Sequence, residues 1–342
     1  MRPADLVGRP AYLTRRRVVR VTAILGVLLL GSLVLASMLG PVHVNLWAAL
    51  SGDADSADRA IVLHTRIPRV LLAAVVGAAL SVAGAGLQGL LANPLADPHL
   101  LGVSGGAAVV GAAVLVLGVD PVSPWVPFAA FLGALATASM VVLVARTGGR
   151  TTPHALLLTG VVTNALAAAL IMLVNALASY RQAQGVLFWM MGALSTQSYG
   201  LVAVAGGYVS VGAVVLLRYA PALNLLAAGE ESAASLGVEV EHVRRMVFVA
   251  AALLVGAAVS VSGMISFVGL IVPHVLRLLL GPDLRLLLPA SCLGGAIFLV
   301  WADTLARTAL GPVELPVGVV TALLGGPFFL MLLRRSFQGR AV

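Results

Sequence analysis

The sequence contains no lysine, since all 21 of its basic residues are arginine. Without lysine the chain cannot build a Walker A phosphate loop, whose GxxxxGK pattern requires one, and it cannot form a Schiff base. Its single cysteine, Cys292, excludes an intrachain disulfide and lies in an apolar run, where it is expected to pack as a small apolar residue. Any ATP hydrolysis that serves this protein must therefore take place on another chain.

Charge is also scarce, because only 10% of the 342 residues are charged while 60% are hydrophobic, with a mean hydropathy of +1.06. Soluble domains are about 45–50% apolar and about 25% charged, so this composition indicates an integral membrane protein. Apolar segments long enough to cross a bilayer, together with one shorter segment, predict about ten spans. They cover residues 18–40, 67–91, 99–118, 125–145, 155–177, 199–217, 246–264, 267–281, 286–305 and 316–333.

The placement of arginine predicts the topology. With a cytoplasmic N-terminus, 16 of the 21 arginines fall on the inner side, and the outer side keeps Arg59, Arg66, Arg69, Arg181 and Arg307. The positive-inside rule then favours two cytoplasmic termini, with residues 1–17 as a cytoplasmic tail. The basic isoelectric point is explained by this topology, so no nucleic-acid partner is expected.

An internal repeat suggests two related halves. "VGAALSVAG" at 76–84 and "VGAAVSVSG" at 255–263 agree at seven of nine positions. The two copies lie five predicted spans apart and so run in opposite directions. This offset is the one that an inverted-topology repeat produces.

A polar kink, "LLANPLADPHLLGVSGGA" at 90–107, separates two apolar runs. Pro94 and Pro98 cannot continue a regular helix, while Asn93 and Asp97 suit turn and cap hydrogen bonds. One interpretation is a capped cytoplasmic turn that serves folding, and the other is a direct contact of the segment up to His99 with substrate.

A second motif, "ISFVGLIVPHVLRLLLGPDLR", carries Pro273, His274 and Arg277. His274 and Arg277 share one helix face, and Arg277 is near enough to the inner end to reach the interface. Asp303 and Arg307 are four residues apart in a later span, which favours an ion pair if the helix continues that far.

The interval "NLLAAGEESAASLGVEVEHVRR" at 224–245 is polar and predicted to be cytoplasmic. Gly229 and Gly237 suit helix ends, and Glu230 and Glu231 suit the first turn of a short helix. The interval is either a solvated loop or a docking surface for a partner.

Together these residues resemble one family, the FecCD-like permease subunits of ABC importers for ferric siderophores, haem and cobalamin. The resemblance covers about residues 60 to 335. It rests on "QGLLANPLADPHLLGVSGGA", "GEESAASLGV", "SFVGLIVPHVLRLLLG", "LPASCLGGAIFLVWADTLAR" and "ELPVGVVTALLGGPFFLMLLRR". It implies an all-α, polytopic membrane protein with the type II ABC importer permease fold, in which residues 1–342 form one permease domain of ten helices in two inverted halves.

The resemblance also implies the partners. These are a second permease copy or a paralogue, two cytoplasmic ATPase subunits that hold ATP and Mg, an extracytoplasmic substrate-binding protein and the lipid of a bacterial inner membrane. No cofactor or metal is expected in the chain itself. A ferric siderophore is the leading cargo, with haem and cobalamin as alternatives.

Residue roles follow from the family pattern. The cytoplasmic loop 219–245 is expected to hold the coupling helices, the fifth and tenth spans to contribute to the pathway, and the arginines of "RIPR" and "DTLAR" to face the binding protein. The expected residues are, for coupling, Gly229, Glu230, Glu231, Ser232, Ala233, Leu236 and Gly237; for docking, Arg66, Arg69 and Arg307; for an inner gate, Thr152, Pro153 and His154; and for structure, Asn93, Pro94, Asp97, Pro98, Pro273, His274, Arg277 and Asp303.

Two other classes of function fit the sequence less well. A secondary transporter driven by an ion gradient is expected to carry ionisable residues in mid-span, and most of the predicted spans have none. A membrane-embedded enzyme needs a nucleophile with its base or a metal cluster, and the sequence shows neither.

Overall fold

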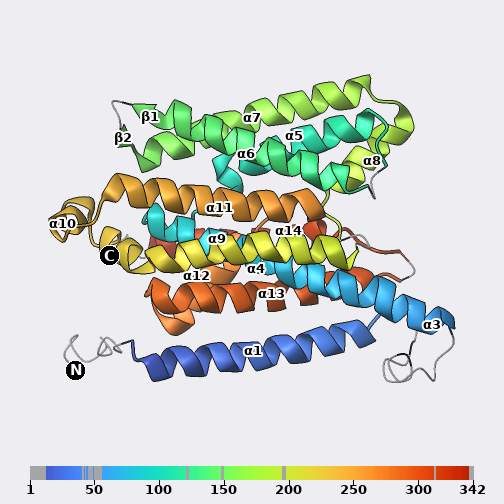
Figure 1. Ribbon diagram of the computed structural model, residues 1–342, viewed down its shortest axis with the longest axis horizontal. Helices are drawn as coiled ribbons and strands as arrows, with labels where there is room; N and C mark the ends of the chain where they lie inside the picture. The colour runs from blue at the N-terminus through green and yellow to red at the C-terminus, as the bar shows by residue number, and fades with distance from the viewer. Residues whose placement is uncertain are drawn as a thin grey trace.

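A computed structural model describes residues 13–40, 42, 44, 49, 56–120, 123–147, 150–194, 198–311 and 313–338. Within these ranges the protein is a bundle of helices that lie roughly side by side along its long axis (Figure 1). The described strands are two residues long each, β1 at Arg146–Thr147 and β2 at Arg150–Thr151, and they form one antiparallel hairpin.

Among the described residues, seven helices are long and apolar enough to cross a membrane. One of them, Ala57–Leu90, is continuous through α3 (Ser56–Ala60), a π-helical stretch (Ile61–Arg66) and α4 (Ile67–Leu90). The other six are α1 (Arg15–Met38), α6 (Trp125–Ala145), α7 (Pro153–Leu177), α9 (Tyr199–Leu226), α11 (Val240–Ser262) and α13 (Leu284–Thr308).

Three further apolar helices are shorter or less uniformly apolar. They are α5 (Val103–Val116), α12 (Val268–Leu280) and α14 (Val317–Gln338), of which Val317–Leu332 is apolar. Each segment that the sequence predicts to span the membrane coincides with a helix. The number of crossings and the inverted relation of the halves stay predictions.

The core is built around α4. In its most apolar stretch 89% of the residues are buried inside the protein, against 6% for α1. Helices α9, α11, α12 and α13 pack around α4. Small residues allow this close packing, and Gly77 and Gly84 of α4 lie directly against backbone of α13 and α12, at Gly295 and Gly269.

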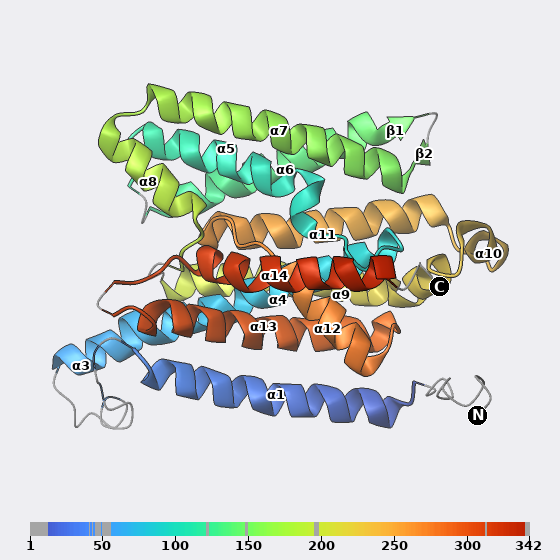
Figure 2. The same cartoon turned by 180° about the vertical axis from the view of Figure 1, so that it is seen from behind.

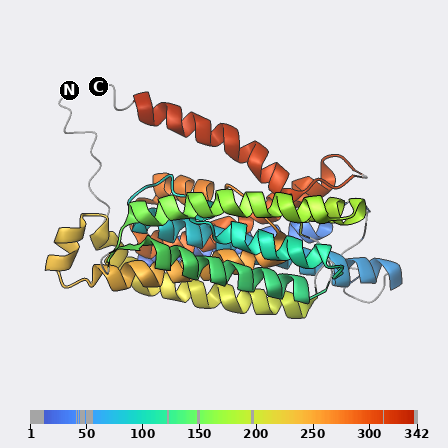
Figure 3. The ribbon, with the colours of Figure 1, turned by 90° about the horizontal axis from the view of Figure 1, so that it is seen from above.

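The remaining helices form outer layers. Helices α5, α6 and α7 lie together on one side of the core, and α1 lies against α13 on the other (Figures 1 and 2). Viewed from above, α14 diverges from the bundle toward its C-terminal end (Figure 3). The start of α1, the end of α14 and α10 (Glu230–Ser235) lie at one end of the bundle, and α3 lies at the other (Figure 1).

The structure differs from the sequence prediction in three places. Helix α9 continues through Pro221 to Leu226 and α11 begins at Val240, so the segment between them is 227–239 rather than 219–245. Helix α8 (Tyr180–Met190) was not predicted, because 11 residues are too few for a span, although Ser179 and Gln182 form a capping box at its start. The β1–β2 hairpin was not predicted either.

Candidate functional site

A cavity of about 440 Å³ lies beside the middle and the C-terminal half of α7. Its wall combines the 3-10 helix η3 (Pro98–Leu101), the first turn of α5, α7, α8 and the link 263–267 between α11 and α12. The described lining contains no arginine, aspartate or glutamate. Its polar and thioether side chains are His99, Ser104, Asn164, Asn175, Ser266, Met172, Met190 and Met264.

Local backbone geometry brings η3 and α5 to this wall. Asp97 caps η3 by accepting from the His99 amide at 2.8 Å, and Gly102 follows in the left-handed conformation, with a φ of 81°. Asn164 of α7 donates to the His99 carbonyl at 2.7 Å, and the His99 Nε2 lies 2.7 Å from the Ile265 carbonyl oxygen. Because a carbonyl only accepts, Nε2 carries the proton.

The link 263–267 completes the wall. Gly263 has a φ of 67°, and a Cβ there would lie 2.0 Å from the Trp189 carbonyl oxygen, so only glycine fits. Phe267 also has a positive φ, of 69°, and lies in the left-handed helical region. Gly318, in the first turn of α14, packs against the carbonyls of Met191 and Met264. The end of α8 and the link 263–267 therefore meet at the cavity, and the start of α14 packs against both.

The polar kink is held by the hydrogen bonds that its sequence predicts. The Asn93 Oδ1 accepts from the Leu95 amide at 3.0 Å, in addition to the Asp97 cap. The kink also touches the second motif, because His274 of α12 interacts with the backbone of Pro94. The kink is thus an ordered turn that is joined to α12.

A buried glutamine near the end of α4, just before the polar kink, links α4 to α12. Gln88 donates to the carbonyls of Gly269 and Leu270 at 3.3 Å and accepts from the Arg277 Nη2 at 3.2 Å. Arg277 thereby gains a polar partner inside the protein, which lowers the cost of placing a guanidinium there.

A cluster of charges lies at the opposite end of the bundle from α10. Asp303 is fully buried, and its carboxylate pairs with the Arg69 Nη2 at 3.1 Å and the Arg307 Nε at 3.0 Å. Arg69 also pairs with Glu314 at 2.7 Å. Four charges thus alternate in sign across α4, α13 and the α13–α14 link.

The polar segment 227–239 contains the short helix α10. Gly229 and Gly237, with φ of 124° and 85°, flank it, as the sequence predicts. Arg244 of α11 is buried and pairs with Glu230 and, at 3.3 Å, with Glu241, so α10 is fixed to the bundle. Leu236, which directly follows α10 in this segment, is 66% exposed.

The sequence of this chain is similar to those of known transport proteins. The model of the FecCD transport family matches residues 25–335. A cobalamin import system permease of Halobacterium salinarum is 46% identical over 296 residues, covering 84% of this chain and 77% of its own length. A hemin transport system permease of Yersinia pestis is 40% identical, covering 93% and 97%.

The fold matches as well. A solved structure of an inward-facing metal-chelate type ABC transporter superimposes with a TM-score of 0.80 and 29% identity, over 93% of this chain and 99% of that one. The chain belongs to the FecCD transport family. It is a permease subunit of an ABC importer, a multi-pass membrane protein of the inner membrane that is not itself catalytic, and the ATPase is a separate subunit.

For this FecCD permease the three arginines expected at a docking surface do not have the expected exposure. Arg66 and Arg307 are buried, and only Arg69 is partly accessible, with 13% of its side chain exposed. Arg66 and Arg307 are buried because they hydrogen-bond to the end of α1, where the last carbonyls lack helical partners. Arg66 donates to the carbonyls of Ser37, Met38 and Val42, and Arg307 donates to those of Ala36 and Leu39.

The residues expected at an inner gate form the start of α7. The Thr152 hydroxyl accepts from the Ala155 amide at 3.2 Å, Pro153 is the first helical residue, and His154 is exposed. This is an N-cap followed by proline, which is a stable way to begin a helix. None of the three lines the cavity, and their role as a gate stays a prediction.

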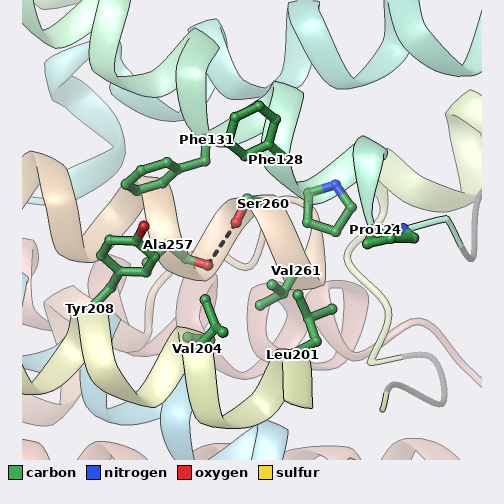
Figure 4. Close-up of a pocket in the computed structure, with 11 residues that line it drawn as sticks. Pro124, Phe128, Phe131, Leu201, Val204, Tyr208, Ala257, Ser260 and Val261 are labelled. Carbon is green, nitrogen blue, oxygen red and sulfur yellow. Dashed lines mark hydrogen bonds between the residues drawn. The ribbon is translucent and has the colours of Figure 1, made fainter. Parts of the chain in front are cut away.

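A smaller groove of about 220 Å³ lies between α6, α9 and α11 (Figure 4). Phe131 and Tyr208 face each other across it, with ring centroids 4.9 Å apart. The hydroxyl of Ser260 donates to the Ala257 carbonyl at 2.9 Å and is therefore satisfied. Apart from Ser260, the polar side-chain group of the described lining is the hydroxyl of Tyr208.

Near the α10 end, Asp283 joins two helices. It caps α13 by accepting from the Arg285 amide at 3.0 Å, and it accepts from Asn224 of α9 at 2.8 Å. The Asn224 Oδ1 in turn accepts from the Leu284 amide at 3.0 Å. Hydrogen bonding from the Arg285 side chain, the largest favourable cause, lowers the pKa of Asp283 against a smaller opposing effect of burial.

This lowered pKa predicts an acid dependence of stability. Asp283 contributes stability that is fully present above its unfolded pKa of about 3.9 and is lost as pH falls through the lowered folded value. Asp283→Asn should therefore lower the melting temperature of the detergent-solubilised protein at pH 6 and change it less at pH 3. The exposed variant Glu231→Gln is the control, and an equal loss for Asp283→Asn at both pH values would contradict the prediction.

Proposed function

We propose that the cavity beside α7 is part of the pathway through which an ATP-driven importer moves an intact metal chelate across the inner membrane. The observation that carries this proposal is an uncharged described lining of a cavity within an apolar bundle, at a place where the start of α5 and the end of α8 meet the link between α11 and α12. An uncharged wall suits a route on which cargo must bind weakly enough to leave. Helix α7, the fifth predicted span, borders it, and α14, the tenth, begins against the carbonyl of Met264, a residue of its wall.

The cargo that we propose is a ferric siderophore, and cobalamin and haem are the alternatives. Relatives named for cobalamin and for hemin support a metal chelate as the class. The described residues contain no group of three or more His, Cys, Asp or Glu that could hold a metal ion. The ion-gradient hypothesis is set aside, because the family is one of ABC importers.

The orientation is part of the proposal. Two cytoplasmic termini place α10 on the cytoplasmic side, because the start of α1 and the end of α14 lie at the same end of the bundle (Figure 1). There the segment 229–237 docks on the ATPase subunit, and exposed Leu236 is its contact residue. A substrate-binding protein docks at the other end, where Arg69 and Glu314 are accessible. Two copies of the chain, or a copy and a paralogue, complete the pathway.

The coupling segment provides the test. Replacing residues 229–237 with a Gly/Ser linker should abolish ATP-driven uptake of radiolabelled chelate in cells that express the complete importer, since the ATPase loses its contact. Membrane abundance is measured alongside, because the replacement also removes Glu230, a partner of buried Arg244. The same replacement of the turn at 117–120, at the opposite end, is the control. Uptake and stimulated ATPase activity that survive the first replacement would exclude the docking role.

A further inference from the structure

Two side-chain oxygens in the cavity wall are buried without a hydrogen-bond partner among the described residues. They are the Oγ of Ser104, a residue with 2% of its surface exposed, and the Oδ1 of Asn175. They come from α5 and α7. A third acceptor, the Asn164 Oδ1, lies beside Gly105, where a Cβ would approach it to 2.8 Å. Residues of one cavity wall thus carry three acceptor oxygens, and the two that lack a partner lie just beneath the surface of the wall.

Unpartnered polar atoms are rare in folded proteins because burying one without a hydrogen bond is costly. Other helical serines of this chain avoid the cost by donating to a carbonyl one turn earlier, as Ser139 and Ser262 do. Ser81 and Ser291 also lack partners, but they do not line the cavity. A ligand in the cavity could offer Ser104 and Asn175 the donors that the protein does not supply.

The lining also limits the charge of that ligand. Its described residues offer no arginine to neutralise a carboxylate, and His99 already uses its Nε2 proton on the Ile265 carbonyl. An anionic chelate would enter a low-dielectric space without a counter-charge, which is unfavourable. Met172, Met190 and Met264 instead provide polarisable apolar surface that adapts to an irregular ligand.

From these observations we infer that the cavity selects uncharged chelates that carry N–H or O–H donors, and that Asn175 and Ser104 are specificity-determining residues which accept from those donors. The inference rests on the proposed function, and it narrows the cargo to chelates whose metal charge is balanced within the ligand. Polyanionic chelates are disfavoured by the same wall.

The experiment measures binding of three probes to the full chain in complex with its ATPase subunit in lipid nanodiscs, by equilibrium dialysis. Cyanocobalamin and ferrichrome are uncharged and carry amide donors, whereas ferric citrate is anionic. We expect the uncharged probe that fits to bind at least tenfold more tightly than ferric citrate. Asn175→Ala and Ser104→Ala should each weaken that binding by about threefold to tenfold, the effect of one hydrogen bond.

A stability readout separates this role from a structural one. Ser104→Ala should leave the melting temperature unchanged or raise it, because it removes a polar group that has no partner in the protein. Ser260→Ala is the matched control, since that buried hydroxyl is satisfied and lies in the other groove. It should leave probe binding unchanged.

Three outcomes overturn the inference: tighter or equal binding of ferric citrate, binding of none of the probes, and variants that bind as the wild type does. The proposed function is tested separately by the loss of uptake on replacing residues 229–237. An importer that depends on that segment but carries an anionic chelate would disprove the selectivity and leave the permease function standing.

Discussion

Replacing Asp303 with alanine is expected to destabilise the protein by about 3–5 kcal/mol, the cost of removing one partner from a buried ion pair. Asp303 is fully buried between Arg69 and Arg307, with nitrogen-to-oxygen distances of 3.1 and 3.0 Å. Without it, two guanidinium groups face each other in the interior. The loss should extend to α1, because Arg307 also holds the carbonyls of Ala36 and Leu39.

The measurement is thermal unfolding of the purified protein in detergent, together with its abundance in the membrane. Glu314→Ala is the control, since Glu314 pairs with the same Arg69 but has 44% of its side chain exposed, and it should cost less than about 1 kcal/mol. Joint replacement of Asp303 with Leu and of Arg69 and Arg307 with Met should recover part of the loss, because no buried charge is left unpaired. Equal effects of Asp303→Ala and Glu314→Ala would contradict this account.

At this charge cluster the sequence reveals the interaction within one helix but not the interaction between helices. The Asp303–Arg307 pair was predicted, because a spacing of four residues on a helix places two side chains together whatever else the fold does. The partnership of Asp303 with Arg69 was not predicted, because it joins residues 234 positions apart and depends on how α4 packs on α13.

The burial of Arg66 was likewise not predicted, because it also depends on how the helices pack. From the sequence it is one of a few arginines on the outer side and thus a candidate for a partner's carboxylate. Whether an arginine faces outward or caps a neighbouring helix depends on where that helix ends, and α1 ends at Met38, beside Arg66. Docking of a binding protein stays a prediction, and Arg69 is the arginine of the three that the structure leaves within reach of it.

The helices were predicted well because hydropathy over a window of about 20 residues is a local property. The cavity was not predicted, since Asn175 is a single polar residue in an apolar helix, and its spacing from Ser104 in the polar kink has no periodicity that marks a site. The polar kink was the best available signal. Its two interpretations were a capped turn and a contact with substrate. The described contacts of Asn93 and Asp97 agree with a turn, whereas His99 and Ser104 of the same segment line the cavity.

The second large effect is expected at Gly84, where α4 crosses α12. A Cβ on Gly84 would lie 1.8 Å from the Gly269 carbonyl oxygen, far inside van der Waals contact. That oxygen belongs to backbone and also accepts from Gln88, so it cannot move aside as a flexible side chain could. Gly84→Ala should force the two helices apart and cost at least about 1–3 kcal/mol, the usual range for overpacking.

Gly207→Ala in α9 is the matched control, because it is the same substitution in a helix interior with no atom within 4 Å of the added Cβ. It should be neutral or stabilise by up to about 1 kcal/mol, since alanine has the higher helix propensity. Membrane abundance and the melting temperature in detergent distinguish the two variants, and Gly84→Ala behaving as Gly207→Ala does would show that α4 and α12 are not in contact. Because α12 follows the link 263–267 directly, any Gly84→Ala protein that folds should also bind chelate less tightly in the cavity. Gly84→Ala is therefore expected to disturb both the packing of the core and the shape of the cavity.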